Sequence, residues 1–284
     1  MNAPRLLLPC TIFAGVLHLA AAPIAVKYGP PSDRSILGTT FVDWDSLSGK
    51  PTGVGVFRPV FDNPTPALEK FEMHVTTLLP GKMSHPVHQH PWEEMLFIKE
   101  GSVDVSANGV LHAAGPGSLV FLASHDPHNA INHGAAPATY YVINFVTDRV
   151  HTVADKPAAE QAVPGLLGST VFACDRLDST PTPTGARVNI VDAPTLTFKR
   201  LSVHLTTLNP GQRTKPALID EGDELFIVRQ GVLEARVNGI ACRLKAGSFF
   251  YCAPNDRRSL RNLGSGPASY LVIKVVSDRS PSAS

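Results

Sequence analysis

Residues 88–94, HQHPWEE, are rich in side chains that bind metal ions. His88 and His90 are separated by one residue, and Glu94 follows four residues after His90. In a β-strand alternate side chains share a face, so these three would all point to one side, into a barrel if the strand lines one. Two imidazoles and a carboxylate would be costly to bury there without an ion, and we therefore predict a metal site.

Three ligands on one strand define only part of a coordination sphere, so a neighbouring strand must supply a fourth. The segment SHDPHNAIN, residues 124–132, offers His128, with His125 nearby. A lone histidine is usually structural, but one that meets other ligands is a candidate for the same ion. The fold must therefore bring residues 88–94 and 124–132 together.

The framework around these residues occurs twice in the chain. The segment FEMHVTTLLPGKMSHPVHQHPWEEMLFIKEG at 71–101 aligns without a gap on LSVHLTTLNPGQRTKPALIDEGDELFIVRQG at 201–231, and the register continues to Arg149 over Arg279. The shared residues are mostly turn formers at fixed positions. Such a period is too long for a solenoid unit and fits two whole domains, which we predict at 26–155 and 156–284.

Within each repeat the pattern is that of short strands. SVDVSANGVLH and LEARVNGIACRL each place Asn-Gly between alternating segments, and this dipeptide favours the type I′ turn of a two-residue hairpin. Strands punctuated by Gly and Pro, with no convincing amphipathic helix, favour an antiparallel sandwich or barrel. We predict an all-β fold of two tandem jelly-roll barrels, the double-stranded β-helix architecture.

The first 25 residues have the layout of a secretory signal peptide. Arg5 precedes the apolar run LLLPCTIFAGVLHL, and the small residues of AAAPIA follow. The run is shorter than the ~20 residues that a membrane span requires. We predict export to the periplasm or the exterior, with cleavage between Ala20 and Ala25 and no membrane span afterwards; a buried N-terminal strand or helix is the alternative.

Composition restricts the class of partner. The 284 residues are 43% hydrophobic and 17% charged, enough for two ordinary cores, and the formal net charge is +1. This balance gives no reason to expect nucleic acid or an anionic membrane surface as a partner. We expect a small-molecule substrate, and a homo-oligomer is possible.

The two motifs resemble those of the cupins, whose first motif has His-x-His and Glu between two glycines and whose second has Gly, Pro-x-Gly, His and Asn. The matching residues are Gly81, His88, His90, Glu94 and Gly101, then Gly117, Ala123, His125, His128 and Asn132. The sequence departs by one extra residue before His88, by Ala123 for Pro and by His125 for Gly. Histidine and asparagine tolerate positive φ, and the second repeat has Asn255 there. The resemblance covers nearly all of the chain after residue 25 and implies a bicupin.

Residue by residue, the resemblance implies that His88, His90, Glu94 and His128 bind one divalent metal in the N-terminal cupin domain. Four protein ligands in an octahedral scheme leave two positions for water, a substrate oxygen or dioxygen. The softness of these ligands argues against calcium and for manganese, iron, nickel, copper or zinc.

Four further residues are candidates for orienting a ligand or moving a proton: Glu93, His85, His125 and Tyr140. Glu93 alternates to the other face of its strand, and His85 precedes a proline in an expected loop. We take His125 as the candidate catalytic acid–base residue.

The second repeat has lost most of the ligands. At the equivalent positions His88 becomes Leu218, His90 becomes Asp220, His128 becomes Arg258, and Glu94 is kept as Glu224. One ligand cannot hold a metal, whereas a guanidinium can replace the positive charge of an ion and pair with carboxylates. We predict a C-terminal cupin domain with a degenerate metal site and Arg258 paired with Glu224, Asp220 or both; binding of an acidic ligand by Arg258 is the alternative.

Cys174, Cys242 and Cys252 remain after removal of residues 1–25. Cys242 and Cys252 flank an expected turn at 245–248, and export would permit one disulfide between them. Free thiols are the preferred interpretation.

The resemblance implies two classes of function. The first is a metal-dependent enzyme on a small oxygenated or carboxylate substrate, an oxidoreductase similar to the bicupin dioxygenases; a metal-dependent decarboxylase of the oxalate type or a ureidoglycine aminohydrolase-like hydrolase would use the same open positions. The second is a non-catalytic exported protein that binds a small molecule. Cupins host many activities, so turnover that requires the metal is the observation that separates the two classes.

Overall fold

The computed structural model describes residues 24–25, 35–153, 163–215 and 222–281. Its regular structure consists of β-strands and three short 3-10 helices, so the predicted all-β fold of two jelly-roll barrels is confirmed. Residues 1–23 of the predicted signal peptide lie outside the described residues. Within the described part, no helix has the length and apolar character needed to cross a membrane.

The first barrel consists of a seven-stranded and a five-stranded sheet. The larger sheet has the order β13 (Thr170–Ala173), β10 (Ser118–Leu122), β7 (Glu93–Glu100), β12 (Ala138–Val146), β5 (Lys70–Leu78), β4 (Gly55–Asn63) and β3 (Lys50–Pro51). The smaller sheet has the order β1 (Ile24–Ala25), β6 (His88–Gln89), β11 (His128–Ile131), β8 (Val103–Ala107) and β9 (Val110–Ala114).

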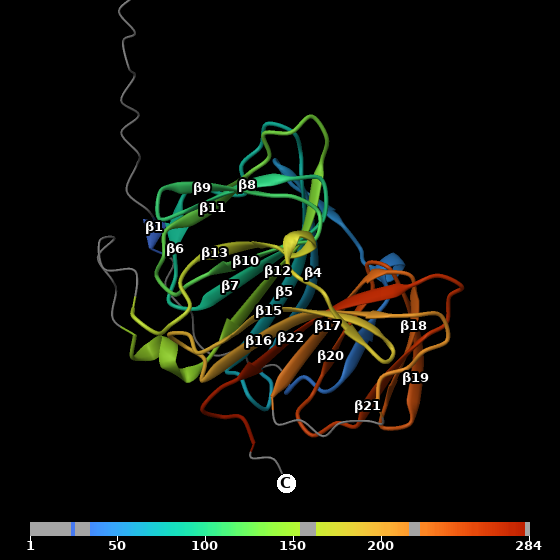
Figure 1. Cartoon of the computed structure of the whole chain (residues 1–284). Coiled ribbons are helices and arrows are strands. Elements are labelled where there is room, and N and C mark those ends of the chain that lie inside the picture. Colours follow the sequence, from blue (N-terminus) through green and yellow to red (C-terminus); the bar gives the residue numbers. More distant parts are fainter. Residues whose placement is uncertain (1–23, 26–34, 154–162, 216–221, 282–284) are drawn as a thin grey trace, which may run out of the picture.

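The second barrel repeats this plan (Figure 1). Its seven-stranded sheet has the order β14 (Thr180–Thr182), β15 (Gly185–Ala193), β16 (Arg200–Leu208), β22 (Ala268–Val276), β17 (Asp223–Gln230), β20 (Phe249–Cys252) and β2 (Thr40–Val42). The small sheet comprises β19 (Ile240–Lys245), β18 (Val232–Val237) and β21 (Arg258–Asn262). The 3-10 helices are η1 (Trp44–Ser46), η2 (Asp148–His151) and η3 (Cys174–Arg176).

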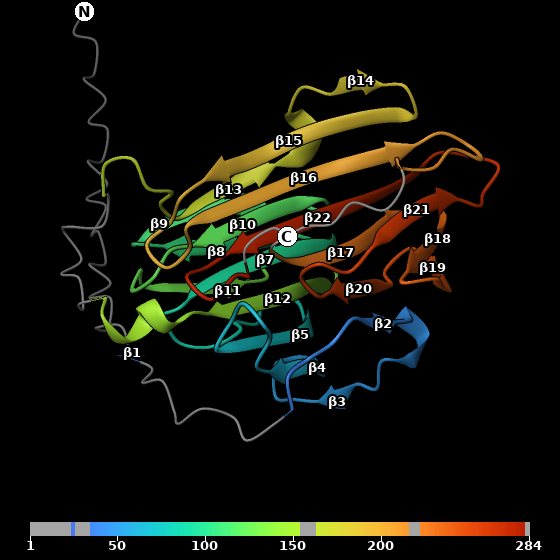
Figure 2. The same ribbon diagram turned by 90° about the horizontal axis from the view of Figure 1, so that it is seen from below.

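Each barrel borrows one strand from the other half of the chain (Figure 2). Strand β2 pairs with β20 of the second barrel, and β13 pairs with β10 of the first. The residues just before these strands anchor the exchange in equivalent ways, because Thr39 donates to Asp256 and Ser169 donates to Asp126 at 2.6 Å. The sheets therefore cross the predicted domain boundary at residue 155 in both directions.

A hydrophobic core shared by both halves fills the space between the two large sheets. Phe71 and Phe145 of the first half stack with ring centroids 5.1 Å apart, and Phe71 also meets Tyr251 of the second half at 5.7 Å. Each barrel has a further apolar cluster of its own. Alternate residues of the large-sheet strands thus serve two cores, one within the barrel and one between the barrels.

Two buried carboxylates cross this interface in equivalent positions. Glu93 accepts hydrogen bonds from Thr195 Oγ1 at 2.6 Å and Thr197 Oγ1 at 2.8 Å. Asp223 accepts from Thr65 and from the Tyr251 hydroxyl, the latter at 2.8 Å. Burial raises the pKa of Glu93 to about 7 and that of Asp223 to about 6, against the opposing effect of these hydrogen bonds.

Exposed ion pairs repeat the same symmetry at the edge of the interface. Arg149 pairs with Asp278 at 2.6 Å, and Arg279 pairs with Asp148 at 2.5 Å. Isolated pairs of this kind contribute little to stability in water. Their reciprocity shows instead that the two repeats are related by an approximate two-fold arrangement.

The turns agree with the sequence. Asn108 and Asn238 adopt φ of 53° and 48°, each followed by a glycine with positive φ, in hairpins that join β8 to β9 and β18 to β19. His125 and Asn255 adopt φ of 62° and 64°, as predicted for the positions where the cupin motif has glycine. The cysteines at 174, 242 and 252 are free thiols, so the alternative of a bridge between the last two is not found.

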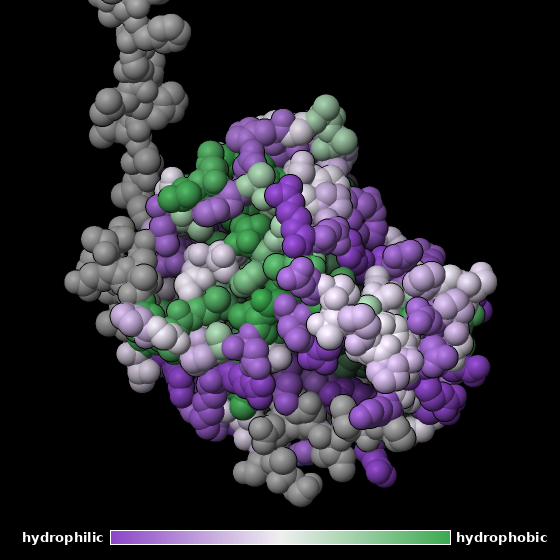
Figure 3. Space-filling view, in the orientation of Figure 1, coloured by the Kyte–Doolittle hydropathy of each residue, from purple (hydrophilic) through white to green (hydrophobic). Residues whose placement is uncertain are grey.

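Hydrophobic residues reach the surface over β9, as Figure 3 shows. Val110 and Leu111 are 56% and 58% exposed, and β9 lies at the end of its sheet. An exposed apolar strand edge can pair with another chain. The possible homo-oligomer stays a prediction.

Candidate metal centre

The predicted ligands come from three strands and one turn, not from a single strand face. His88 lies on β6 of the small sheet, Glu94 lies on β7 of the large sheet, and His90 lies in the turn between them. The expectation that one strand carries all three is therefore wrong, because the chain changes sheet across Pro91. His128, on β11, is the direct pairing partner of His88.

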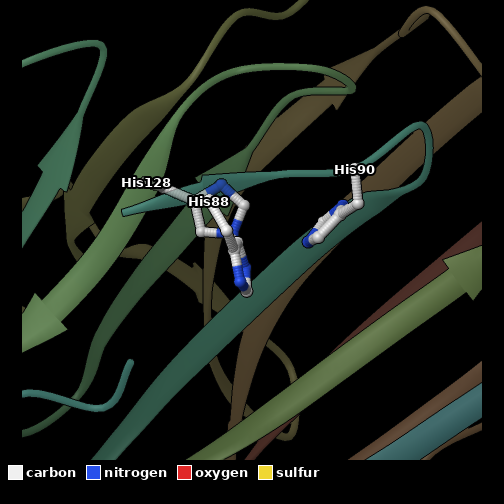
Figure 4. A group of neighbouring side chains, drawn as sticks. All are labelled: His88, His90 and His128. Carbon is white, nitrogen blue, oxygen red and sulfur yellow. The ribbon is translucent and has the colours of Figure 1, made fainter. Parts of the chain in front are cut away.

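These elements bring the three imidazoles together (Figure 4). One nitrogen from each of His88, His90 and His128 lies within 4.8 Å of the others. His88 Nε2 and His128 Nε2 are 3.2 Å apart. The Glu94 carboxylate lies beside the cluster, with oxygens 3.6 Å from His90 Nε2 and 3.8 Å from His128 Nε2. All four predicted ligands thus meet at one place.

Hydrogen bonds on the outer side of the cluster fix two of the imidazoles. His90 Nδ1 lies 2.9 Å from the Trp92 carbonyl, and His128 Nδ1 lies 2.7 Å from the Asp126 carbonyl. A carbonyl only accepts, so both Nδ1 atoms carry a proton and both Nε2 atoms present a lone pair when the rings are neutral. His90 Nε2 is buried and has no hydrogen-bond partner among the described residues. This donor set fits a divalent transition metal.

The protonation states suit the same role. Burial, together with the neighbouring His85, His128 and His90, lowers the pKa of His88 to about 3. Burial also lowers the pKa of His128 to about 4, although the charge of Glu94 opposes the shift. Burial alone would raise the pKa of Glu94, but the contacts with His90 and His128 outweigh it and hold the pKa at about 2. Near pH 7 these side chains therefore carry the lone pairs and the negative charge that a metal requires.

A cavity of about 410 Å³ opens onto the cluster. This volume falls in the range typical of small-molecule sites. Its lining comprises Thr52, Val54, Val56, Phe57, His74, Thr76, Ser84, His85, His88, His90, Trp92, Glu94, Leu96, Leu122, His128, Asn129, Ala130, Tyr140, Val142 and Asn144.

The other predicted residues lie in different surroundings. His85 stacks on His88 with ring centroids 3.9 Å apart, and Tyr140 lines the cavity with its pKa raised by burial. Glu93 faces the interface between the barrels, as its alternation predicted. His125 is buried but is not among the residues that line the cavity. Its positive φ is the backbone conformation expected at this position of the motif, and its acid–base role stays a prediction.

Sequence reasoning missed His74 and Glu72. His74 lines the cavity from β5, and its Nδ1 lies 2.8 Å from Glu72 Oε1. The available signal was their spacing of two within an alternating strand, since it places both side chains on the face that carries the cavity.

The second barrel has an ion pair where the first has its ligands. Arg258 Nε lies 2.5 Å from Glu224 Oε2, and both side chains are buried. The Arg258 guanidinium also lies 5.7 Å from the centre of the Phe226 ring. The predicted pairing with Glu224 is confirmed, while Asp220 and Leu218 lie outside the described residues. The described part of this barrel contains no group of three metal-ligating side chains.

Comparisons with known proteins agree with this geometry. The profile of the cupin domain matches residues 74–144 and 204–274, one segment in each barrel. A segment of 60 residues is 42% identical to L-ectoine synthase of Hahella chejuensis; it covers 20% of this chain and 45% of that enzyme, so the chain spans less than half of this curated relative.

Two solved structures share the fold over most of the chain. A putative glyoxylate-induced protein of Pseudomonas aeruginosa is 17% identical with a TM-score of 0.68, covering 93% of this chain and 98% of that one. Oxalate decarboxylase of Bacillus subtilis is 16% identical with a TM-score of 0.63, covering 87% and 80%. At these identities the likeness concerns the architecture.

Proposed function

The chain belongs to the cupin family and carries two cupin domains, and from this premise we propose that it is an exported metal-dependent enzyme. Its substrate is a small oxygenated organic molecule that binds in the cavity of the first barrel, and the reaction is of the dioxygenase type. The second barrel is a scaffold. Its buried Arg258–Glu224 pair occupies the position where the first barrel has its ligands.

The observation that carries this proposal is the position of the ligand cluster on the cavity wall. His88, His90, His128 and Glu94 all line the cavity, so a substrate that enters it meets them directly. A divalent metal held by these residues would supply a Lewis acid with open positions for an oxygen atom. His88 and His128, whose pKa values burial lowers to about 3 and about 4, would bind this metal near pH 7 without first losing a proton.

The rest of the cavity wall points to the substrate class. Away from the cluster it is largely apolar, with valines, Phe57, Leu96 and Leu122. Among the described lining residues none is a lysine or an arginine. A dianion such as the oxalate in the name of the Bacillus subtilis enzyme would find no side-chain cation for its second carboxylate apart from histidine. The wall therefore favours a molecule with an apolar body and an oxygen-bearing end.

The test compares metal-stripped protein with protein reloaded separately with manganese, iron, nickel, copper or zinc. We expect turnover of a small enol or hydroxy acid with oxygen uptake at an oxygen electrode, and only in a reloaded sample. Release of carbon dioxide without oxygen uptake would identify a decarboxylase instead. Equal binding of such compounds with and without metal, and no turnover in any sample, would identify the non-catalytic binding protein.

Export is the second part of the proposal, and it is supported by the sequence of residues 1–25 alone. We expect the full-length gene product to be found outside the cytoplasm with a new N-terminus between Ala20 and Ala25. N-terminal sequencing of the protein purified from its native compartment provides the measurement. A mature cytosolic protein that still begins at Met1 would contradict export.

A further inference from the structure

His74 stands apart from the metal centre but shares its cavity. Across the sheet, Glu94 on β7 pairs with Asn144 on β12, which pairs with Glu72 on β5. Two residues further along and on the same face, Val142 on β12 pairs with Leu96 on β7 and with His74 on β5. His74 therefore lies two strands across the sheet and two residues along it from Glu94, a distance of about 12 Å between Cα atoms at the usual strand dimensions. A substrate in the cavity can reach both.

A chain of hydrogen bonds sets the protonation of His74. The Trp92 indole, which can only donate, donates to Asn144 Oδ1 at 3.1 Å. This contact turns the amide nitrogen of Asn144 toward Glu72 Oε2, 2.6 Å away. The other oxygen of the carboxylate then accepts from His74 Nδ1 at 2.8 Å. Because both oxygens of the carboxylate accept, the proton of this last hydrogen bond belongs to His74, which therefore carries it on Nδ1.

The Nε2 atom of His74 is consequently the lone-pair nitrogen of the neutral ring. Phe57 packs against this ring with centroids 4.7 Å apart and holds it at the cavity wall. The Glu72 carboxylate would stabilise the imidazolium that forms when Nε2 takes up a proton. An imidazole backed by a carboxylate in this way is a recurring arrangement for a general base.

The second barrel shows that this arrangement accompanies the metal ligands. His74 is matched there by His204, but Glu72 is replaced by Ser202, Asn144 by Lys274 and Trp92 by Gly222. The fold therefore accepts the histidine without its partners. The hydrogen-bonded chain occurs in the barrel that has the ligand cluster.

We propose that His74, with Glu72 behind it, is the general base of the cavity and accepts the proton of an acidic hydroxyl group of the substrate. In this step the substrate O–H bond breaks, a bond from Nε2 to hydrogen forms, and the electron pair stays on the substrate oxygen. The substrate class is thereby narrowed to a molecule with an apolar body and an enolic or phenolic hydroxyl. The inference rests on the proposed function.

The first experiment observes the base itself. In zinc-loaded protein with ¹⁵N-labelled histidine, NMR should show His74 protonated at Nδ1 and not at Nε2. The variant Glu72→Gln should reverse this tautomer, since the glutamine oxygen would accept from Asn144 and its amide would donate to Nδ1. Zinc stoichiometry should stay at the parent value. A parent ring protonated at Nε2, or a tautomer unchanged by Glu72→Gln, would overturn the proposal.

The second experiment uses 4-nitrophenol as a probe for an acidic hydroxyl with an apolar body. We expect His74→Gln to weaken its binding to the zinc-loaded protein about tenfold, the effect of losing roughly one charge-assisted hydrogen bond. The matched variant His204→Gln should leave binding unchanged. Equal affinities of the parent and His74→Gln for 4-nitrophenol would refute the role of His74 as the general base. Absence of binding to the parent would count against the proposed function, and the tautomer measurement would still decide the role of His74.

Discussion

Replacing Arg258 with methionine is expected to lower the free energy of unfolding by about 3–5 kcal/mol. The guanidinium and the Glu224 carboxylate are both buried, with Nε and Oε2 2.5 Å apart. Removal of the arginine alone leaves the buried Glu224 carboxylate without a counter-charge. The cost of this uncompensated buried charge accounts for most of the expected loss of stability. Urea denaturation of the parent and the variant measures the difference.

The matched control removes the carboxylate as well. Adding Glu224→Gln to Arg258→Met should recover much of the lost stability, because a neutral group of similar size needs no counter-charge. Adding Asp220→Leu tests the second predicted partner, which lies outside the described residues. Metal content should be unchanged in every variant, because the ligand cluster is in the other barrel. A single variant that unfolds like the parent would rule out a structural role for the pair.

Loss of the metal is the second large effect. The variant His88→Ala, His90→Ala should no longer hold about one divalent metal per chain, because it removes two of the three clustered imidazoles. The affinity should fall by more than the roughly 10–100-fold that changes in outer-shell partners cause. Elemental analysis after dialysis gives the stoichiometry of the parent and the variant.

The control for this experiment is Arg258→Met, which should keep its metal despite its lower stability. Such a result would separate the loss of ligands from general destabilisation. A double histidine variant that retains stoichiometric metal would refute the assignment of the centre. Melting curves recorded with and without added metal would show whether the parent alone is stabilised by it.

Much of the architecture could be predicted from the sequence because the same local signals occur in both repeats. The Asn-Gly turns at 108 and 238 determine the hairpins through their backbone conformation alone. His125 was correctly expected at positive φ for the same reason. Such features depend on a few neighbouring residues, so a sequence states them directly.

The ligand set could be named although its geometry was misjudged. His88 and Glu94 were expected on one strand, but Pro91 lies where the chain passes from the small sheet to the large one. The side chains converge nevertheless, because both sheets face the same barrel interior. Their motif spacing reflects this convergence and not a single strand.

His74, the proposed general base, could not be recognised from the sequence because the residues around it come from distant segments of the chain. His74 gains its role from Glu72 on its own strand, but also from Asn144 and Trp92, which are remote in the sequence. His125, the acid–base candidate named from the sequence, is not among the residues that line the cavity.

The exchange of β2 and β13 has a consequence for the order in which the protein can be completed during synthesis. The first barrel cannot close its large sheet until residue 173 has left the ribosome, so a nascent chain that ends at residue 155 has an open edge beside β10. The second barrel, in turn, completes its large sheet only if residues 40–42 are not yet paired with another strand when β20 forms. Neither half is therefore an independent folding unit, and the two barrels should gain and lose their structure together in one cooperative step.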